Sequence, residues 1–129
     1  MREKVSLPKT DKLLAKLKTP TSILVRSHGT LYSCGVPPID LENGTLVEGS
    51  VESQAEAVLA LMKQALEEAG SSMSKVIKTT IFVTDTSHFG PVNEVYKKHF
   101  EEPYPVRSFI AVKPWSINMD IEIECIAEC

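Results

Sequence analysis

The segments PYPVRSFIAV, residues 103–112, and DIEIECIA, residues 120–127, flank a Lys-Pro-Trp turn and are predicted to form the last two β-strands of the chain. The first strand has a single arginine, Arg107, at the head of an otherwise apolar run. The second carries Glu122 and Glu124, which share one strand face because side chains alternate with a period of two. Antiparallel pairing across the turn would bring Arg107 and a glutamate to one end of the sheet.

These residue types indicate chemistry on a small carboxylic acid. Arginine offers a planar fork that pairs with both oxygens of a carboxylate. A nearby glutamate can orient a water molecule or move a proton. Judged from these residues alone, a surface ion pair is the commoner role for Arg107, and a solvated edge or an intersubunit salt bridge is the commoner role for Glu124.

The rest of the chain predicts an α+β fold. Ser22–Ser27 and Thr30–Gly35 are β-prone and flank a His28-Gly29 turn, and Asn43-Gly44 precedes a possible short return strand. Apolar residues at helical spacing follow the N-cap Ser50, and Gly70 ends that helix. The remaining predicted elements are the return strand Thr45–Val47, a strand at Lys75–Thr84 and a helix capped by Asp85, Thr86 or Ser87 that runs to about Phe100.

The predicted element order is therefore β-β-β-α-β-α-β-β in one domain spanning residues 1–129, with residues 1–18 as an extension of uncertain structure. Two helices most simply cover one face of a single mixed sheet. The other face then lacks a cover within the chain, which predicts association with further copies.

Composition narrows the classes of function. The chain has 129 residues, 43% of them hydrophobic, and a net charge of −3, which disfavours nucleic acid as a partner. No apolar run approaches the roughly 20 residues of a membrane span, and the N-terminus lacks the apolar stretch of a secretory signal. The three scattered cysteines form no disulfide framework, which favours a reducing cytoplasm. The sequence has no CxxC or HxxxH spacing, so a metal site is not expected.

An ordered set of short matches covers nearly the whole chain after residue 19. The matching runs are LYSCGVP (31–37), NGTL (43–46), LEEAG (66–70), VIKTTIFVTD (76–85), FGPVNEVY (89–96) with Phe100, PVRS (105–108) and IEIECIA (121–127). Together they resemble the Rid (YjgF-like) family of reactive intermediate deaminases.

This resemblance implies a chorismate-mutase-like fold, assembled as a homotrimer with a cleft between neighbouring subunits. Active members hydrolyse 2-imino acids, the tautomers of enamines, to 2-oxo acids and ammonia without a cofactor. In the family's pattern Arg107 would hold the substrate carboxylate and Glu122 would position the attacking water. Backbone groups near Cys34-Gly35 and Cys125 would line the pocket.

The chain departs from the family's pattern at three places near that cleft. Thr21 stands where a tyrosine is usual, Val36 where a glutamine is usual, and Phe109 where enzymatic members often have cysteine. Thr21 remains a candidate lining residue, as does Phe89, although packing is the simplest role for Phe89. The departures remove polar groups and add apolar bulk, so they imply an altered side-chain preference or a loss of deaminase activity.

Three functions remain open from the sequence. The first is an enamine/imine deaminase, and the second is a protein that binds a 2-oxo acid or similar carboxylate without turnover. The third is a specialised catabolic deaminase of a larger amino-enoic acid. Cleavage of RNA, to which some relatives have been linked, is disfavoured by the acidic composition.

Overall fold

The computed structural model describes all residues, 1–129, and shows the α+β fold that the sequence predicts. The strands are β1 (Glu3–Lys4), β2 (Leu24–Ser27), β3 (Thr30–Ser33), β4 (Val76–Val83), β5 (Val106–Ala111) and β6 (Ile121–Glu128). The α-helices are α1 (Pro8–Leu14), α2 (Val51–Glu68) and α3 (Phe89–His99), and short 3-10 turns occupy Ala15–Leu17, Met73–Lys75 and Thr86–His88. The strands form one mixed sheet in the order β1-β2-β3-β6-β4-β5.

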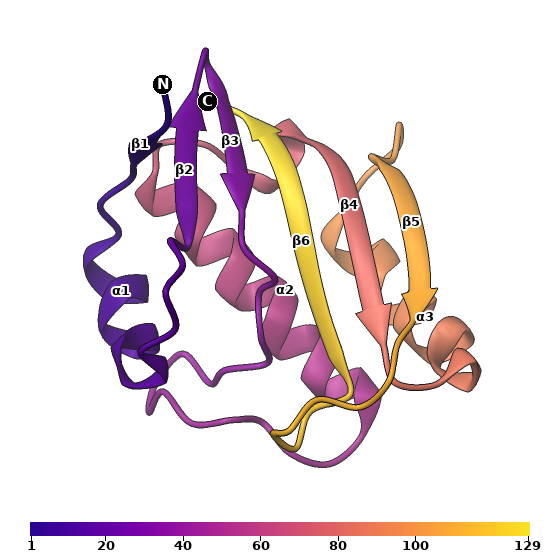
Figure 1. Cartoon of the computed structure of the whole chain (residues 1–129). Coiled ribbons are helices and arrows are strands. Elements are labelled where there is room, and N and C mark those ends of the chain that lie inside the picture. Colours follow the sequence, from indigo (N-terminus) through magenta and orange to yellow (C-terminus); the bar gives the residue numbers. More distant parts are fainter.

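The predicted pairing of the last two strands with each other is wrong. β4 lies between them, parallel to β5 and antiparallel to β6, as Figure 1 shows. β6 also pairs with β3, so it occupies the middle of the sheet while β5 forms its edge. The segment from Val112 to Asp120 is long enough to cross over β4 and join β5 to β6. A local turn pattern does not distinguish such a crossover from a hairpin.

The helices cover one face of the sheet. α2 begins after Ser50, whose side chain accepts a hydrogen bond from the Ser53 N–H, and Gly70 follows its end with φ +83°. α2 packs against β6 and α3, and both helices lie behind the sheet in Figure 1. The side chains between these layers form the core, whose largest fully buried members include Leu31, Leu59, Leu66, Ile81, Ile121 and Ile123.

The two predicted turns form, but only one joins two strands. His28 and Gly29 both have positive φ, 50° and 76°, as a tight two-residue hairpin requires, and they connect β2 to β3. Asn43-Gly44 also turns the chain, with hydrogen bonds from the Glu42 and Asn43 N–H groups to the Asp40 carboxylate. The expected strand Thr45–Val47 is reduced there to a single bridge between Ile39 and Leu46, flanked by backbone hydrogen bonds from Asp40 N–H to Thr45 O and from Val47 N–H to Pro38 O.

Residues 1–18, left uncertain by the sequence, are folded onto the domain. β1 extends the sheet beside β2, and Val5 and Leu7 are buried. The Glu68 carboxylate at the end of α2 accepts hydrogen bonds from Lys9 N (2.7 Å), Thr10 N (2.9 Å) and Thr10 Oγ1 (2.6 Å). Desolvation opposes ionisation of Glu68, but these bonds outweigh it and lower the pKa of its carboxyl group. The resulting clamp holds α1 against α2.

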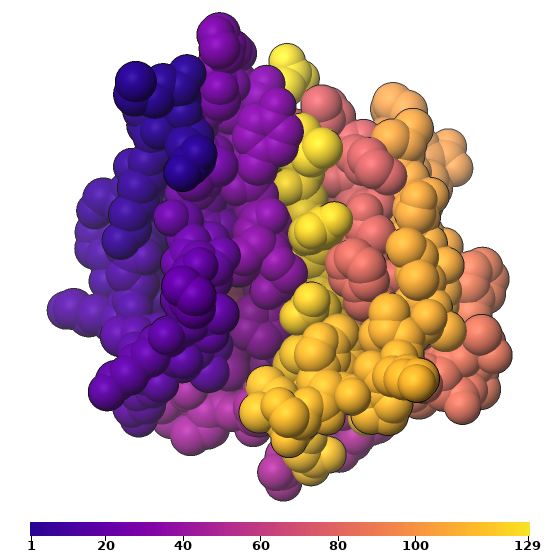
Figure 2. All heavy atoms as spheres, viewed as in Figure 1, coloured from indigo at the N-terminus to yellow at the C-terminus, as the bar shows by residue number.

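The face of the sheet opposite the helices is open in the single chain, as Figure 2 shows. Alternation along the paired strands places Val25, Tyr32, Phe82, Ile110 and Ile126 on this face, and none of them is buried. An exposed apolar strip across several strands is unusual for a monomer. Separately, no helix in this structure is both long enough and apolar enough to cross a membrane.

Candidate functional site

Arg107 lies on the helix-covered side of the sheet, at its edge. It pairs with Thr79 of β4, and the Thr79 hydroxyl shares a 2.8 Å hydrogen bond with Tyr96 of α3, so all three side chains lie on that side. The Arg107 Cζ is 5.0 Å from the ring centre of Tyr96 and 5.7 Å from the rings of both Phe89 and Phe109. Aromatic faces attract a guanidinium, so this aromatic cage holds its position.

The Arg107 guanidinium makes no hydrogen bond and no ion pair within the chain; Lys97 pairs with Glu94, and the His99 imidazole lies 2.8 Å from Glu56. Its N–H donors therefore remain available for an anion. The Val112 N–H donates to Val83 of β4, and alternation directs the Arg107 and Phe109 N–H groups away from β4, toward the open edge. The sheet edge thus presents a charged fork together with backbone donors.

Asn93 lies early in α3, where the sequence makes local hydrogen bonding its simplest role. Its Oδ1 is the one buried side-chain oxygen or nitrogen without a hydrogen-bond partner. Asn93 stands four residues after Phe89 and three before Tyr96, so all three share the α3 face that carries the aromatic cage. The helical spacing from Phe89 was the available signal, and a buried carbonyl without a partner on the helix face that cages Arg107 makes Asn93 a functional candidate.

Glu122 lies on the opposite, open face. It pairs with Phe82, whose neighbours on β4, Ile81 and Val83, are buried beneath the helices. Its carboxylate lies directly against Gly35: a Cβ atom at residue 35 would stand 2.6 Å from Glu122 Cδ. Burial, followed by repulsion from Glu124, raises the pKa of the Glu122 carboxyl group above its ordinary value. Glycine at position 35 is therefore required for this carboxylate to occupy its place.

Arg107 and Glu122 consequently do not meet within one chain. One side chain lies on the helix side at the β5 edge, and the other lies on the open side in the middle strand. The expectation that a hairpin would bring them to one end of the sheet fails because β4 separates their strands. A substrate that contacts both must lie between two copies of the chain.

The ladder between β3 and β6 is interrupted beside Glu122. Pairing stops after Tyr32 with Ile126 and resumes as a bridge from Val36 to Ile123. The chain that follows β3 therefore has one more residue in this interval than β6 has. The Ser33 hydroxyl fills the break by accepting from Cys125 N and donating to the Cys34 carbonyl. The N–H groups of Cys34 and Val36 bond to Ile23 and Ile123, but the Gly35 N–H between them donates to no group in the chain.

The two cysteines beside this break, Cys34 and Cys125, do not supply a reactive thiol to the expected pocket. The Cys125 side chain is buried on the helix side, so only its backbone reaches the break. Burial raises the pKa of both thiols to about 11, with Glu122 adding to the effect at Cys34. Neither thiol is ionised near neutral pH, so neither has the reactivity of a thiolate.

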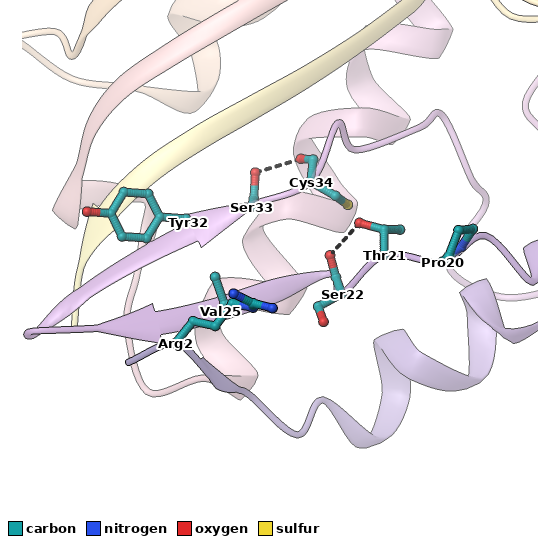
Figure 3. A pocket seen from close by; sticks show the side chains of 8 residues that line it. All are labelled: Arg2, Pro20, Thr21, Ser22, Val25, Tyr32, Ser33 and Cys34. Atoms are coloured by element: carbon teal, nitrogen blue, oxygen red, sulfur yellow. Dashed lines mark hydrogen bonds between the residues drawn. The ribbon is translucent and has the colours of Figure 1, made fainter.

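An open pocket of about 490 Å³ adjoins this break (Figure 3). It brings together the predicted residues Thr21 and Cys34, which come from the chain before β2 and the end of β3. Thr21 Oγ1 donates locally to the Ser22 carbonyl. The complete lining is Arg2, Pro20, Thr21, Ser22, Val25, Tyr32, Ser33 and Cys34. Phe89, Arg107 and Cys125 do not line it, and no cluster of side chains suited to hold a metal ion is present.

Comparisons with known proteins match this chain over most of its length. The family model described as endoribonuclease L-PSP matches residues 15–129. Reactive Intermediate Deaminase A, chloroplastic, of Arabidopsis thaliana is 41% identical over 84% of this chain and 58% of that protein, so the chain spans less than two thirds of this relative.

Two solved structures are also similar to this chain over most or all of its length. The Rid-family protein YyfA of Yersinia pestis is 30% identical, with a TM-score of 0.89 over 100% of both chains. E. coli TdcF, solved with bound serine, is 32% identical, with a TM-score of 0.79 over 86% of this chain and 89% of that chain.

Proposed function

This chain belongs to the endoribonuclease L-PSP family, which includes reactive intermediate deaminases, and from this membership we propose that it hydrolyses 2-imino acids to 2-oxo acids and ammonia. The observation that carries the proposal is the Arg107 guanidinium, caged by three aromatic rings yet without any hydrogen-bond or ion-pair partner. Holding an unpaired charge in a fixed place is costly unless a ligand uses it.

In the proposed reaction Arg107 binds the substrate carboxylate. Its fork donates hydrogen bonds to both oxygens of the substrate carboxylate, and the outward Phe109 N–H lies on the same edge to supply a further donor. Each charge-assisted hydrogen bond contributes about 1.5–3 kcal/mol. Because the carboxylate is attached to the reacting carbon, fixing it also fixes the position of the imine.

In the same reaction Glu122 transfers the protons. The raised pKa of the Glu122 carboxyl group lies closer to neutral pH than that of an ordinary glutamate. A group whose pKa is near the working pH is better able to take up a proton and return it. Glu122 takes a proton from a water molecule as the water oxygen bonds to C2 of the imine. It returns that proton to the imine nitrogen, which gives a carbinolamine. It then transfers the carbinolamine's hydroxyl proton to the same nitrogen as the C=O bond forms and the C–N bond breaks, which leaves the 2-oxo acid and ammonia. An imine is already electrophilic, so this reaction needs little more than orientation and one placed water.

Assembly would unite the two halves. The open edge of β5 in one copy would lie along the open face of the next, which places the first copy's Arg107 near the second copy's Gly35 and Glu122. A contact between two different surfaces closes into a ring rather than a twofold dimer. The resemblance to the Rid family implies that this ring is a homotrimer. The exposed apolar strip on the open sheet face supports such packing.

A coupled assay tests the proposed reaction. An amino acid oxidase with catalase, or a threonine dehydratase, generates the imine, semicarbazide traps what remains, and added protein competes with the trap. We expect wild type to divert imine to 2-oxo acid, and Arg107→Ala to lower kcat/KM about 100-fold or more. Arg26→Ala removes a different arginine on the helix side and serves as the control. No diversion by wild type over several imines would overturn the proposal.

A second candidate is binding of a small carboxylate without turnover. Phe109 stands 5.0 Å from Phe89 in an edge-to-face pair beside Arg107, which adds apolar bulk where the reacting group would lie. E. coli TdcF with bound serine shows an amino acid on a relative, although that concerns TdcF itself. Binding of 2-oxo acids without diversion of any imine would favour this candidate. RNA cleavage, named in the family's description, has less support because phosphate binding requires a basic face.

A further inference from the structure

The pocket beside Cys34 has the chemistry of an anion subsite. Three of its lining groups are hydrogen-bond donors that have no partner in the chain, namely the Arg2 guanidinium and the hydroxyl groups of Ser22 and Tyr32. No carboxylate lines the pocket. The volume of about 490 Å³ falls within the range typical of small-ligand sites.

Arg2 is held over this pocket by the structure of the N-terminal segment. It precedes β1, in which Glu3 and Lys4 pair with Arg26 and Val25 of β2. Alternation places Arg2 and Lys4 on the open face, the same face as Val25 and Tyr32. The buried side chains of Val5 and Leu7 and the clamp formed by Glu68 anchor the following residues. Figure 3 shows the Arg2 side chain beside Val25.

The lining of the pocket ends one residue before the proposed reaction centre. Cys34 belongs to its lining, and the next residue, Gly35, contacts the Glu122 carboxylate. A substrate whose reacting carbon lies at Glu122 could therefore extend past Cys34 toward Arg2. Under the proposed function its first carboxylate would be bound by Arg107 of the neighbouring copy.

From this arrangement we propose that Arg2 binds a second carboxylate of the substrate, so that the preferred substrates are 2-imino dicarboxylates. The inference rests on the proposed function for the identity of the reacting group. The two arginines would hold the two ends of the molecule, and Glu122 would lie between them. Lys4 has the same charge and lies on the same face but does not line the pocket, which makes it a matched control.

A binding measurement tests Arg2 without requiring turnover. Calorimetry compares 2-oxoglutarate, which has a second carboxylate, with 2-oxobutanoate, which has none. We expect wild type to prefer 2-oxoglutarate, and Arg2→Ala to weaken 2-oxoglutarate binding about tenfold while changing 2-oxobutanoate binding less than about twofold. Arg2→Lys should restore part of the preference, and Lys4→Ala should leave it intact. An unchanged preference in Arg2→Ala would overturn the inference.

A turnover measurement separates this inference from the proposed function. The coupled assay is run with the imines of glutamate and of 2-aminobutanoate on wild type, Arg2→Ala and Lys4→Ala. We expect the ratio of the two kcat/KM values to fall about tenfold in Arg2→Ala alone. Hydrolysis of both imines with an unchanged ratio refutes the role of Arg2 and leaves the deaminase proposal standing. Hydrolysis of neither imine, with Arg2-dependent binding retained, refutes the deaminase proposal instead.

Discussion

The environments of Arg107 and Glu122 differ in almost every respect. Arg107 stands on an edge strand, on the helix side, among three aromatic rings. Glu122 stands on the central strand, on the open side, against a glycine and near a second acid. The first environment accommodates a cation and leaves its donors free, whereas the second disfavours the charged form of an acid.

If the proposed function holds, its chemistry is divided between two surfaces of one chain. The arginine side is suited to bind a fixed charge, and the glutamate side is suited to exchange a proton. Neither surface is complete by itself, and β4 prevents their meeting within a chain. The variants below test this division, beginning with the one that depends on it entirely.

Mixing two inactive variants should restore activity if the site is shared between copies. Co-expressed Arg107→Ala and Glu122→Gln chains form interfaces in which both intact residues face each other. Random assembly gives about one quarter of the interfaces this arrangement, so about one quarter of wild-type activity should return. The coupled assay on co-purified, differently tagged chains measures it.

The control for that mixture is Arg107→Ala with an Arg107→Ala/Glu122→Gln double variant, in which no interface has an intact arginine. A mixture of the two single variants that stays as inactive as its parents would contradict a shared site. Restoration in the control would place the activity elsewhere in the molecule.

Glu122→Gln should separate activity from stability. Loss of the proton acceptor should lower kcat about 100-fold, and wild-type activity should fall as pH drops through the raised pKa. The folded state keeps the Glu122 proton to a higher pH than the unfolded chain does, so this group lowers stability as pH rises above 4.5. The variant should therefore melt at the same or a higher temperature than wild type at pH 8. A lower melting temperature there would argue for a structural role of the charge.

Gly35→Ala should damage the glutamate side and spare the arginine side. The added methyl group would collide with the Glu122 carboxylate and displace it, so kcat should fall about tenfold. Gly90→Ala is the matched control, since a methyl group there meets no atom within 4 Å. Binding of 2-oxobutanoate measures the arginine side in both variants. Equal activity in both would mean that the position of Glu122 is unimportant.

Asn93→Leu should have the smallest effect and act on the arginine side alone. Replacing an unpaired buried carbonyl with an apolar group of similar size should leave the melting temperature unchanged or raise it. If Asn93 Oδ1 orients the Arg107 guanidinium when substrate is bound, KM should rise by about fivefold to tenfold with kcat less affected. Steady-state kinetics and thermal melts provide both values. An unchanged KM would limit Asn93 to packing.

The fold was predictable where the signals are local. The His28-Gly29 turn, the Ser50 cap and the helical stripe ending at Gly70 each depend on neighbouring residues, and each appears as expected. The bridge at Leu46 shows the limit, because turn chemistry alone does not decide whether a return strand forms.

The roles of the candidate site residues stay predictions, and their geometry could not be predicted from the sequence. In the structure Gly35 and Glu122 contact each other, and Thr21 and Cys34 share a pocket. The face on which Arg107 lies depends on its register with Thr79, and that register is set by a strand distant in sequence. The aromatic cage and Asn93 follow from the packing of α3 on β5, which no pattern within either segment specifies.

The clamp at Glu68 also determines how the chain opens. The segment from β1 through α1 is joined to the rest mainly by the hydrogen bonds of one carboxylate, the two residue pairs between β1 and β2, and a few buried side chains. Such a segment can unfold locally at a lower free energy than the whole domain. The Lys9 and Thr10 amide protons would then exchange with solvent ahead of those in β4 and β6. Since Arg2 belongs to this segment, the fraction of molecules in which the segment is closed would scale the affinity of the proposed Arg2 subsite.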